Sequence, residues 1–315
     1  MAATTTFGNA DVMRANLLKA IKTYDAQPQI TFYEDLAGNI IGTEQLFELA
    51  AQVSGISLPT ITPEYGVVPT TSMTQIARKQ YNYQKRTLQF RWSDESFIND
   101  NYGIVKGYGS LIAGVFAQAK DIAAAVYLNG ATNTALISTP FAQPLASTAH
   151  PLETGTDSNT FVTQQTLGVI ALEDATTALL NQQAYKNYPM PKFGPFQLEV
   201  ANRNNHLSAR LISSDKQPQS FVNDFNSVAG KATGAGRQAG IIVKRIVSPY
   251  FTNPEWWALR STENAKHNRF MLSRYGFKLM PVVYDEDNDS WKVTAKEAYL
   301  FDVFDYRGAF YSTPS

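Results

Sequence analysis

The chain of 315 residues contains no cysteine. This absence excludes a disulfide framework, a thiolate nucleophile and any zinc site built on cysteine. Histidine is also scarce, and we interpret His150, His206 and His267 as surface or turn residues rather than metal ligands. No Gly-x-Ser-x-Gly elbow occurs, so hydrolase chemistry has no support in the sequence.

Neither sign of charge is in excess, because 27 Lys and Arg residues face 27 Asp and Glu residues. Proteins that attract DNA or anionic lipid at long range normally carry a basic excess. The composition therefore disfavours nucleic-acid binding by the chain as a whole and leaves open a local basic patch. Charged residues make up only 17% of the chain, and uncharged polar groups cost less to desolvate. Such a surface could be covered extensively by other subunits.

Long hydrophobic runs are missing too. The longest nearly apolar stretch covers residues 122–128, far below the roughly 18 residues that a membrane span requires. The first residues lack a basic region followed by an apolar run, so the sequence predicts no signal peptide. We expect a soluble protein that is made and kept in the cytoplasm of a host cell.

The strongest helix signal covers residues 102–128. Apolar side chains recur there at steps of three and four, and Asn129-Gly130 provides a C-terminal stop. At 1.5 Å per residue this helix would be roughly 40 Å long. We predict that one face is buried against a sheet, and that this face carries Leu111, Val115, Ile122 and Val126.

The first 60 residues resemble an appendage. Apolar spacing predicts a short helix between Met13 and Tyr24 and a second one that carries Leu46, Phe47, Ala50 and Val53. Residues 57–68 contain two prolines and should be extended. Because two short helices on such a tether bury little by themselves, we interpret this region as an arm that packs on something else.

A basic, aromatic segment follows, since residues 65–93 contain no acid. Aromatic and apolar residues alternate with polar ones in two runs, which is typical of strands, and Lys85-Arg86 falls between the runs. The pattern predicts a two-stranded ribbon, which is marginal alone in water and needs a partner surface. Its candidate contact residues are Arg78, Lys79, Tyr81, Tyr83, Lys85, Arg86 and Arg91.

An acidic segment lies near the C-terminus, where residues 285–307 hold seven acids and three bases. We expect the basic ribbon of one copy to meet this segment of the next copy in a head-to-tail contact, through Asp285, Asp287, Asp289 and Glu297. The alternative is a single-stranded nucleic-acid-binding protein whose ribbon stacks bases and follows phosphates. The aspartates also resemble the start of a calcium loop, but Ser290 and Lys296 break that pattern and no metal is predicted.

The rest of the chain mixes helices and strands, so the fold class is α+β. Strands are predicted at residues 196–201 and 240–247 and as one or two long strands within 290–311. Helices are predicted at residues 165–185 and 206–212, together with a short one from Pro254 that carries Trp256 and Trp257. Residues 220–240 should form a surface loop.

This order of elements resembles the major capsid proteins of tailed bacteriophages, which share the Hong Kong phage-type fold. Several stretches look like the head proteins of Mu-like phages, and they occur in the same order: Ser147-Thr148-Ala149-His150-Pro151-Leu152, Phe196-Gln197-Leu198-Glu199-Val200, Asn253-Pro254-Glu255-Trp256-Trp257 and Asp305-Tyr306-Arg307-Gly308-Ala309-Phe310. The resemblance extends from about Tyr65 to the C-terminus.

The resemblance implies an N-terminal arm (1–62), an extended two-stranded loop (63–100), a peripheral domain with a spine helix (101–185), an axial domain (186–284) and return strands of the peripheral domain (285–315). It implies a non-enzymatic subunit without cofactor that self-assembles into the hexamers and pentamers of an icosahedral head. The implied partners are further copies of the chain, a separate scaffolding protein, a portal, a decoration protein and packaged double-stranded DNA read without sequence specificity. No membrane is involved, and the implied location is the virion.

Overall fold

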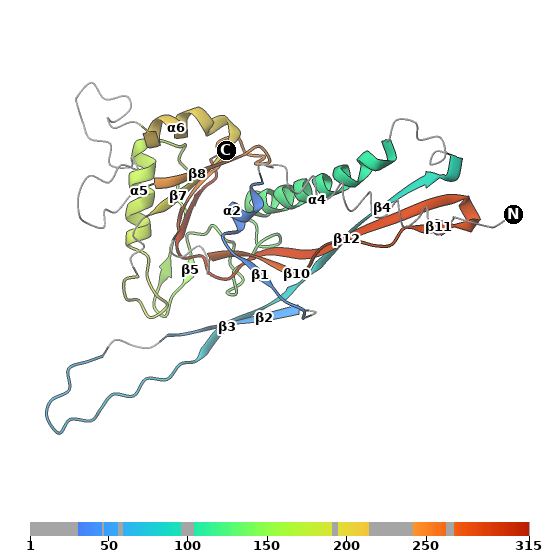
Figure 1. Cartoon of the computed structure of the whole chain (residues 1–315). Helices are drawn as coiled ribbons and strands as arrows, with labels where there is room; N and C mark the ends of the chain where they lie inside the picture. Colours follow the sequence, from blue (N-terminus) through green and yellow to red (C-terminus); the bar gives the residue numbers. More distant parts are fainter. Residues whose placement is uncertain are drawn as a thin grey trace.

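The computed structural model describes residues 31–45, 47–55, 59–95, 104–190, 195–213, 242–262 and 268–314. The short helix predicted between Met13 and Tyr24, the loop predicted at residues 220–240 and the side chain of Leu111 lie outside the described part. Figure 1 shows an elongated molecule, with a long helix lying along one sheet, a second sheet with its own helices beside it, and a long loop leaving the body.

The first sheet has five strands in the order β1 (Ile40–Gly42), β10 (Arg269–Leu279), β12 (Ser290–Val303) and β11 (Val283–Asp285), with β4 (Gln84–Ser93) also paired to β12. The β4–β12 pairing is antiparallel and uses all ten residues of β4. Strand β1 instead runs parallel to β10, so a segment of the predicted arm completes this sheet.

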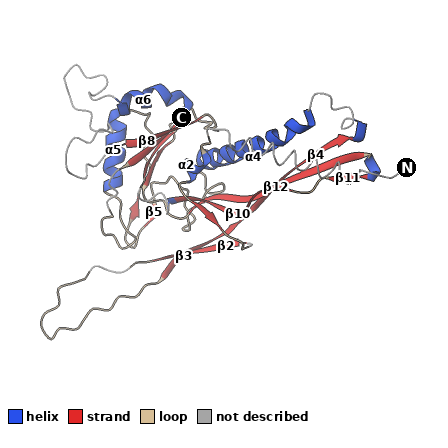
Figure 2. Ribbon diagram, viewed as in Figure 1, coloured by secondary structure: helices blue, strands red, loops and turns tan. Residues whose placement is uncertain are grey.

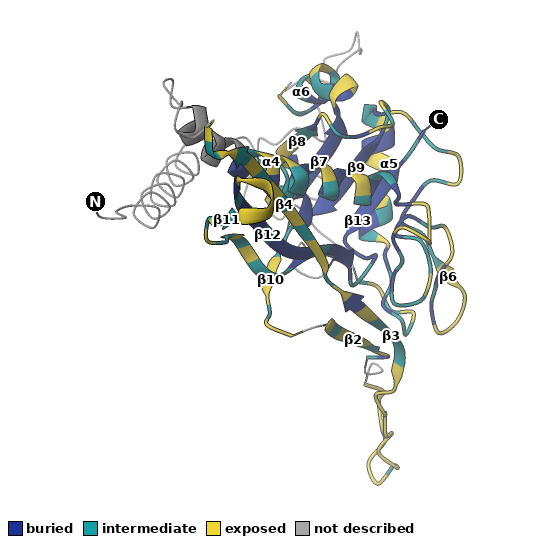
Figure 3. Cartoon of the chain, turned by 90° about the vertical axis from the view of Figure 1, so that its right-hand side faces the viewer, coloured by how far each residue is buried: buried dark blue, intermediate teal, exposed yellow. Residues whose placement is uncertain are grey.

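The second sheet has four strands in the order β13 (Ala309–Ser312), β9 (Trp257–Ser261), β7 (Phe196–Ala201) and β8 (Ile242–Ser248). Every residue of β7, β9 and β13 is buried, and these strands are uniformly dark in Figure 3. Two smaller pairs complete the strands: β2 (Phe47–Val53) with β3 (Gln75–Asn82), and β5 (His150–Pro151) with β6 (Thr156–Asp157).

The described α-helices are α2 (Tyr33–Ala37), α4 (Ile104–Asn129), α5 (Val169–Leu180) and α6 (Asn205–Ser213), as Figure 2 shows, and short 3-10 turns occur at Asn202–Asn204 and Glu286–Asn288. Residues of α5 pack on the four-stranded sheet, whereas α4 contributes to clusters with the five-stranded sheet and with α2. None of the helices in the described ranges is long and apolar enough to cross a membrane.

The long helix has the predicted bounds within two residues, but its predicted buried face is wrong. Val115, Ile122 and Val126 are 49%, 40% and 50% exposed. The buried stripe instead carries Ile112, Ala113, Phe116, Ala124, Ala125 and Leu128. Ala124 and Ala125 belong to a core cluster with residues of β10 and β12, whereas Val115 and Val126 lie next to buried positions and are exposed.

Two further predicted helices are strands. Residues 47–53 form β2 with alternating exposure, because pairing with β3 overrides the helix propensity of its Leu, Glu and Ala residues. Trp257 lies in β9 rather than in a helix, and both Trp256 and Trp257 are fully buried. Burying two indole rings on a sheet stabilises the fold more than a short exposed helix could.

The predicted ribbon also differs from the structure. In the structure, the two paired strands of the ribbon are β2 and β3, and the chain between these two strands forms the extended loop. Lys85 and Arg86 therefore do not form the turn, because β4 continues almost directly from β3 and pairs with β12 over its whole length. The first strand of the extended loop thus belongs to the segment that the sequence assigned to the arm.

The predicted domain boundaries follow chain order, whereas the packing does not. Helix α5, assigned to residues 101–185 with the spine helix, packs with residues of β7, β9 and β13. Strand β10, assigned to the axial segment, lies in the five-stranded sheet, and β13, assigned to the return strands, lies in the four-stranded sheet. The chain crosses between the sheets more often than a division by chain order allows.

Candidate assembly interface

The root of the extended loop is tied to the five-stranded sheet. Lys79 Nζ lies 2.6 Å from Asp302 Oδ1 and also donates to the Ser138 carbonyl at 2.6 Å. The buried Tyr81 donates its hydroxyl to the Val303 carbonyl at 2.9 Å. Because two alternate residues of β3, Lys79 and Tyr81, both bind β12, the loop leaves the body at a fixed position.

Aromatic packing strengthens the same root. The Tyr81 ring meets Phe270 edge to face, with 5.2 Å between ring centroids. Tyr83 is half-buried and packs against the same cluster as Leu300 and Phe304. Burial away from water raises the pKa of Tyr81 well above its ordinary value, so this phenol stays protonated as a donor. The predicted contact residues Tyr81 and Tyr83 therefore act within the subunit.

Several charges of the basic and acidic segments also meet within one chain. Arg91 lies 3.4 Å from Asp285, which Lys292 approaches at 3.5 Å. Glu297 is buried and pairs with Lys120 of α4 at 2.6 Å, opposite Arg86 in the β4–β12 register. The expectation that Lys79, Arg91, Asp285 and Glu297 pair across copies is thus corrected, because intramolecular partners already neutralise them.

A smaller set of charges remains available. Arg78 and Lys85 are exposed, and neither forms an ion pair with a described residue. At the turn between β11 and β12, Glu286 and Asp287 are exposed and likewise form no ion pair within the described ranges. Asp289 accepts a hydrogen bond from the Tyr284 hydroxyl and is held in a left-handed conformation with φ of 44°.

These two sets lie far apart in one subunit. Figure 1 shows the β2–β3 ribbon and its loop at one end of the molecule and the β11 turn at the other. Arg78 therefore cannot meet Glu286 or Asp287 of its own chain. A contact between them requires a second copy.

The extended loop also carries an apolar surface. Along β2 the exposed positions alternate, and they present Phe47, Leu49 and Val53 on one face. The loop beyond adds exposed apolar side chains at Ile61, Tyr65, Val67, Val68 and Met73. Figure 3 shows this loop as almost continuously exposed. A surface of this kind on a rigid root is typical of a protein contact.

The tip of the loop is a tight turn rather than a loose coil. The Gly66 N–H donates to the Pro63 carbonyl at 2.9 Å, and Tyr65 has a φ of 66°. A non-glycine residue with positive φ is uncommon and carries strain. The turn therefore holds Tyr65 in one exposed orientation.

Segment α2, which sequence reasoning did not single out, is held between the two sheets by buried charges. Asp121 of α4 accepts the backbone N–H groups of Phe32 and Tyr33, each at 2.8 Å, and so caps the start of α2. The Asp35 carbonyl accepts hydrogen bonds from Gln197 and Arg260 of the four-stranded sheet. No local sequence signal identifies these partners, because they lie 88 or more residues away.

The buried Glu199 lies beside two buried guanidinium groups. Arg269 Nη2 contacts both carboxylate oxygens at 2.8 Å, and Arg260 Nε lies 3.2 Å from Oε1. Burial, together with the neighbouring Arg269, lowers the pKa of Arg260 to about 10, against the opposing effect of Glu199. The Glu199 carboxylate is thus the shared counter-charge of Arg260 and Arg269 at the boundary between the sheets.

The described residues contain no cluster of His, Asp and Glu suited to a metal ion. His206 is exposed, and His267 lies outside the described residues. The prediction of a surface or turn residue is wrong for His150, which lies in β5, is fully buried and is bonded to Asn159. Among the described residues, the exposed apolar side chains and the charges without an ion pair are the features that point to a contact with another protein surface.

Comparison with known proteins shows which family and which solved structures this chain is similar to. A family model described as phage capsid protein matches residues 77–312. The capsid of a native GTA particle has a similar structure, with a TM-score of 0.60, 10% sequence identity and coverage of 92% of each chain. The capsid of cyanophage P-SCSP1u gives a TM-score of 0.57 at 13% identity, covering 92% of this chain and 90% of that one.

A chain from Microbacterium phage Oxtober96 gives a TM-score of 0.52 at 11% identity, covering 92% of this chain and 93% of that one. No curated protein sequence matches the chain. At such identities the structural likeness concerns the fold, and it confirms the α+β capsid fold expected from the order of elements. The closer likeness to Mu-like head proteins stays a prediction.

Proposed function

The chain belongs to the phage capsid protein family, and we propose that it closes the rings of a tailed-phage head through head-to-tail contacts made by its extended loop. It is a structural subunit of a capsid shell, as the family and the capsid folds of similar structure indicate. It is therefore a component of the virion, and its partners include further copies of itself.

The observation that carries the proposal is the separation of the unpaired charges. Arg78 on the extended ribbon and Glu286 with Asp287 on the β11 turn lie at opposite ends of one elongated subunit. A contact between two different patches is heterologous, and it forms a closed ring when the rotation between copies closes. Hexamers and pentamers are rings of this kind.

The apolar loop surface supplies the area that such a contact needs. Phe47, Leu49 and Val53 on β2 and the loop residues Ile61 and Tyr65 are exposed in the single chain. Burying apolar surface contributes about 25 cal/mol per Å² removed from water. Exposed ion pairs add only about 0–1 kcal/mol each, so we assign the charges to register and direction and the apolar residues to affinity.

The remaining partners are those of a head shell. We propose a separate scaffolding protein, a portal, a decoration protein and double-stranded DNA held without sequence specificity, with assembly in the host cytoplasm. We assign no catalytic role, because a capsid family implies a structural one. The alternative of single-strand binding by the ribbon lacks support, since Lys79 and Arg91 are neutralised by Asp302 and Asp285.

Charge reversal with rescue tests the head-to-tail contact. We expect Arg78→Glu, combined with Lys85→Glu, to leave the far-ultraviolet circular dichroism unchanged and to abolish capsomers in sedimentation and electron microscopy. Adding Glu286→Arg and Asp287→Arg should restore them. The matched control for Arg78→Glu alone is Arg210→Glu on α6, which makes the same single charge reversal at an exposed residue far from the ribbon. Normal assembly of the double reversal would contradict the contact.

A further inference from the structure

Hydrogen bonds from Asn268 hold a segment that joins the two sheets. Residues 304–308, the junction segment, connect β12 of the five-stranded sheet to β13 of the four-stranded sheet. Asn268, next to the start of β10, donates its side-chain amide to the carbonyls of Asp305 at 2.9 Å and Arg307 at 3.0 Å. The Phe304 N–H returns a hydrogen bond to the Asn268 carbonyl at 3.1 Å. The junction is therefore one of the connections that set the relative position of the two sheets, beside the Glu199–Arg269 pair.

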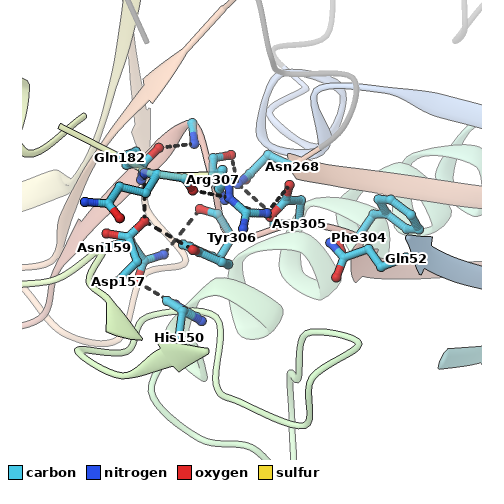
Figure 4. A network of polar contacts seen from close by, with 12 residues as sticks. Gln52, His150, Asp157, Asn159, Gln182, Asn268, Phe304, Asp305, Tyr306 and Arg307 are labelled. Carbon is cyan, nitrogen blue, oxygen red and sulfur yellow. Dashed lines mark hydrogen bonds and ion pairs between the residues drawn. The ribbon is translucent and has the colours of Figure 1, made fainter. Parts of the chain in front are cut away.

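Tyr306 is the central residue of the junction segment and is fully buried. Its ring stacks on the imidazole of His150, with 3.7 Å between centroids and 6° between planes. Its hydroxyl donates to Asp157 Oδ2 at 3.1 Å, as Figure 4 shows. The hairpin of β5 and β6, which carries His150 and Asp157, thus holds the junction segment in place.

The hydrogen bonds around His150 determine its protonation. Asn159 donates its amide Nδ2 to the Leu145 carbonyl at 2.8 Å, so its Oδ1 is the acceptor. That oxygen lies 3.0 Å from His150 Nε2, and it also accepts the Ser147 N–H at 2.9 Å. The imidazole hydrogen therefore sits on Nε2, and Nδ1 is bare.

Nδ1 is buried and has no hydrogen-bond partner among the described residues. A second proton would have to bind there. It would create a buried donor without an acceptor and a cation on a side chain that is 0% exposed. The closed junction therefore favours the neutral form of the His150 imidazole.

Charged groups near the ring only partly oppose this effect. Asp157 lies opposite His150 in the β5–β6 register, and Asp305 belongs to the stacked segment. Asp305 is paired with Arg307 at 3.1 Å, and the Arg307 guanidinium lies 4.7 Å from the centroid of the Tyr306 ring. Tyr306 itself is neutral, because burial raises the pKa of its phenol. Burial is the largest effect on the imidazole and lowers the pKa of His150 to about 4. The hydrogen bond to Asn159, the attraction of Asp157 and Asp305 and the Leu145 carbonyl oppose this shift.

We propose that the stacked pair of His150 and Tyr306 is an acid-sensitive latch that holds the two sheets of the subunit in one relative position. Protonation of His150 at Nδ1 separates the rings, frees the junction segment and lets the sheets move. The same junction reaches the extended loop, because Gln52 of β2 donates to the Phe304 carbonyl at 3.5 Å. Release therefore also loosens the root of that loop. The latch is a property of the single subunit and does not require the proposed ring contact.

The sign of the pH effect follows from proton linkage. An opened junction exposes His150, whose pKa then returns to about 6.5, while the closed junction holds it at about 4. The free energy that favours the closed junction is largest above pH 6.5. It decreases as the pH falls and becomes constant below pH 4. Between pH 7 and pH 5 the equilibrium constant for opening should rise roughly 20-fold.

Hydrogen exchange of the full chain at pH 7 and pH 5, corrected for intrinsic rates, measures this opening. We expect the amides of residues 304–308 to lose protection about 20-fold in the unmodified chain and to show no such change in His150→Phe, which keeps the ring stack and cannot be protonated. His206→Phe, at an exposed histidine, is the matched control and should behave like the unmodified chain. Equal protection at both pH values, or a pH response that persists in His150→Phe, would overturn the latch.

A second measurement tests the latch if the His150→Phe variant does not fold. Nitrogen chemical shifts of the imidazole in the unmodified chain report both its tautomer and its pKa. A hydrogen on Nε2 with a pKa near 4 supports the latch. A hydrogen on Nδ1, or a pKa near 6.5, contradicts it.

Discussion

The Lys79 ammonium group lies 2.6 Å from Asp302 Oδ1, although 223 residues separate the two in the chain. The same carboxylate oxygen accepts the Tyr127 hydroxyl of α4 at 2.8 Å. One carboxylate of β12 thus holds both the ribbon and the long helix. The direction in which the extended loop leaves the subunit is therefore fixed before any second copy binds.

Removing this cation should destabilise the subunit. Lys79→Met leaves Asp302, which is 8% exposed, without its ionic partner, and we expect a loss of about 2–3 kcal/mol in the free energy of unfolding. Denaturant unfolding measures it. The neighbouring Arg78→Met removes an exposed charge with no ion pair among described residues and should cost less than about 0.5 kcal/mol. Equal losses for the two variants would show that the Lys79 contact adds nothing to the fold.

The phase of the long helix gives a second prediction. Phe116 is 5% exposed and meets Phe277 edge to face at 5.1 Å, so Phe116→Ala should cost about 3–5 kcal/mol. Val115→Ala, one residue earlier on the exposed face, should cost less than about 1 kcal/mol. Thermal and denaturant melts of the two variants compare them directly. A larger loss from Val115→Ala would restore the helix face that the sequence indicated.

The sequence predicts the existence and the length of this helix correctly, but it predicts the wrong buried face. Length follows from a long apolar periodicity that ends at Asn129-Gly130, which is a local signal. The buried face depends on what the helix packs against. Ala124 and Ala125 are buried in the cluster that contains Met271 and Tyr299, whereas Val115 and Val126 are exposed. A scale of hydrophobicity alone ranks the valines first and so selects the wrong stripe.

The candidate contact surface shows the same division. Aromatic and basic character in residues 75–93 could be read from the sequence, as could the acidic segment that follows residue 285. The sequence could not show which of these charges pair with each other. Lys79–Asp302 forms only when β3 packs beside β12, and Arg91–Asp285 only when β4 pairs with β12, next to the end of β11. The residues left unpaired, Arg78 among them, become identifiable only in the folded subunit.

The shared carboxylate of Glu199 gives a third prediction. Glu199→Gln leaves two buried guanidinium groups without a counter-charge, and we expect a loss of at least about 3–5 kcal/mol or no folded protein. Arg260→Met removes one of the two cations and keeps the contact of Arg269 with both carboxylate oxygens. It should therefore be much milder than Glu199→Gln in the same unfolding assay. The reverse order would mean that Arg260, and not Arg269, is the main partner.

The cap on α2 gives a fourth prediction. Asp121→Ala leaves the N–H groups of Phe32 and Tyr33 without their acceptor, which should cost about 1–3 kcal/mol. Asp121→Asn keeps an oxygen in the same place and should retain most of the stability. Hydrogen exchange at residues 32–37 provides the local measurement, since only the alanine variant should lose protection there. Equal protection in both variants would argue that packing of Leu36, and not the cap, holds the segment.

The extended loop gives the last prediction, because it separates folding from assembly. Residues 59–74 are exposed almost throughout and contribute no residue to the described core clusters, so replacing 60–72 with a short Gly-Ser linker should change the free energy of unfolding by less than about 1 kcal/mol. The same replacement removes Ile61, Tyr65 and Val67 and should leave a folded subunit that forms no capsomers. Sedimentation and electron microscopy of the purified chain test this, and Ile61→Ser with Val67→Ser is a milder variant that keeps the loop length. If the shortened chain still assembles into closed shells, the loop does not carry the ring contact, and the faces of α4 that expose Val115, Ile122 and Val126 become the next candidate for contact between copies.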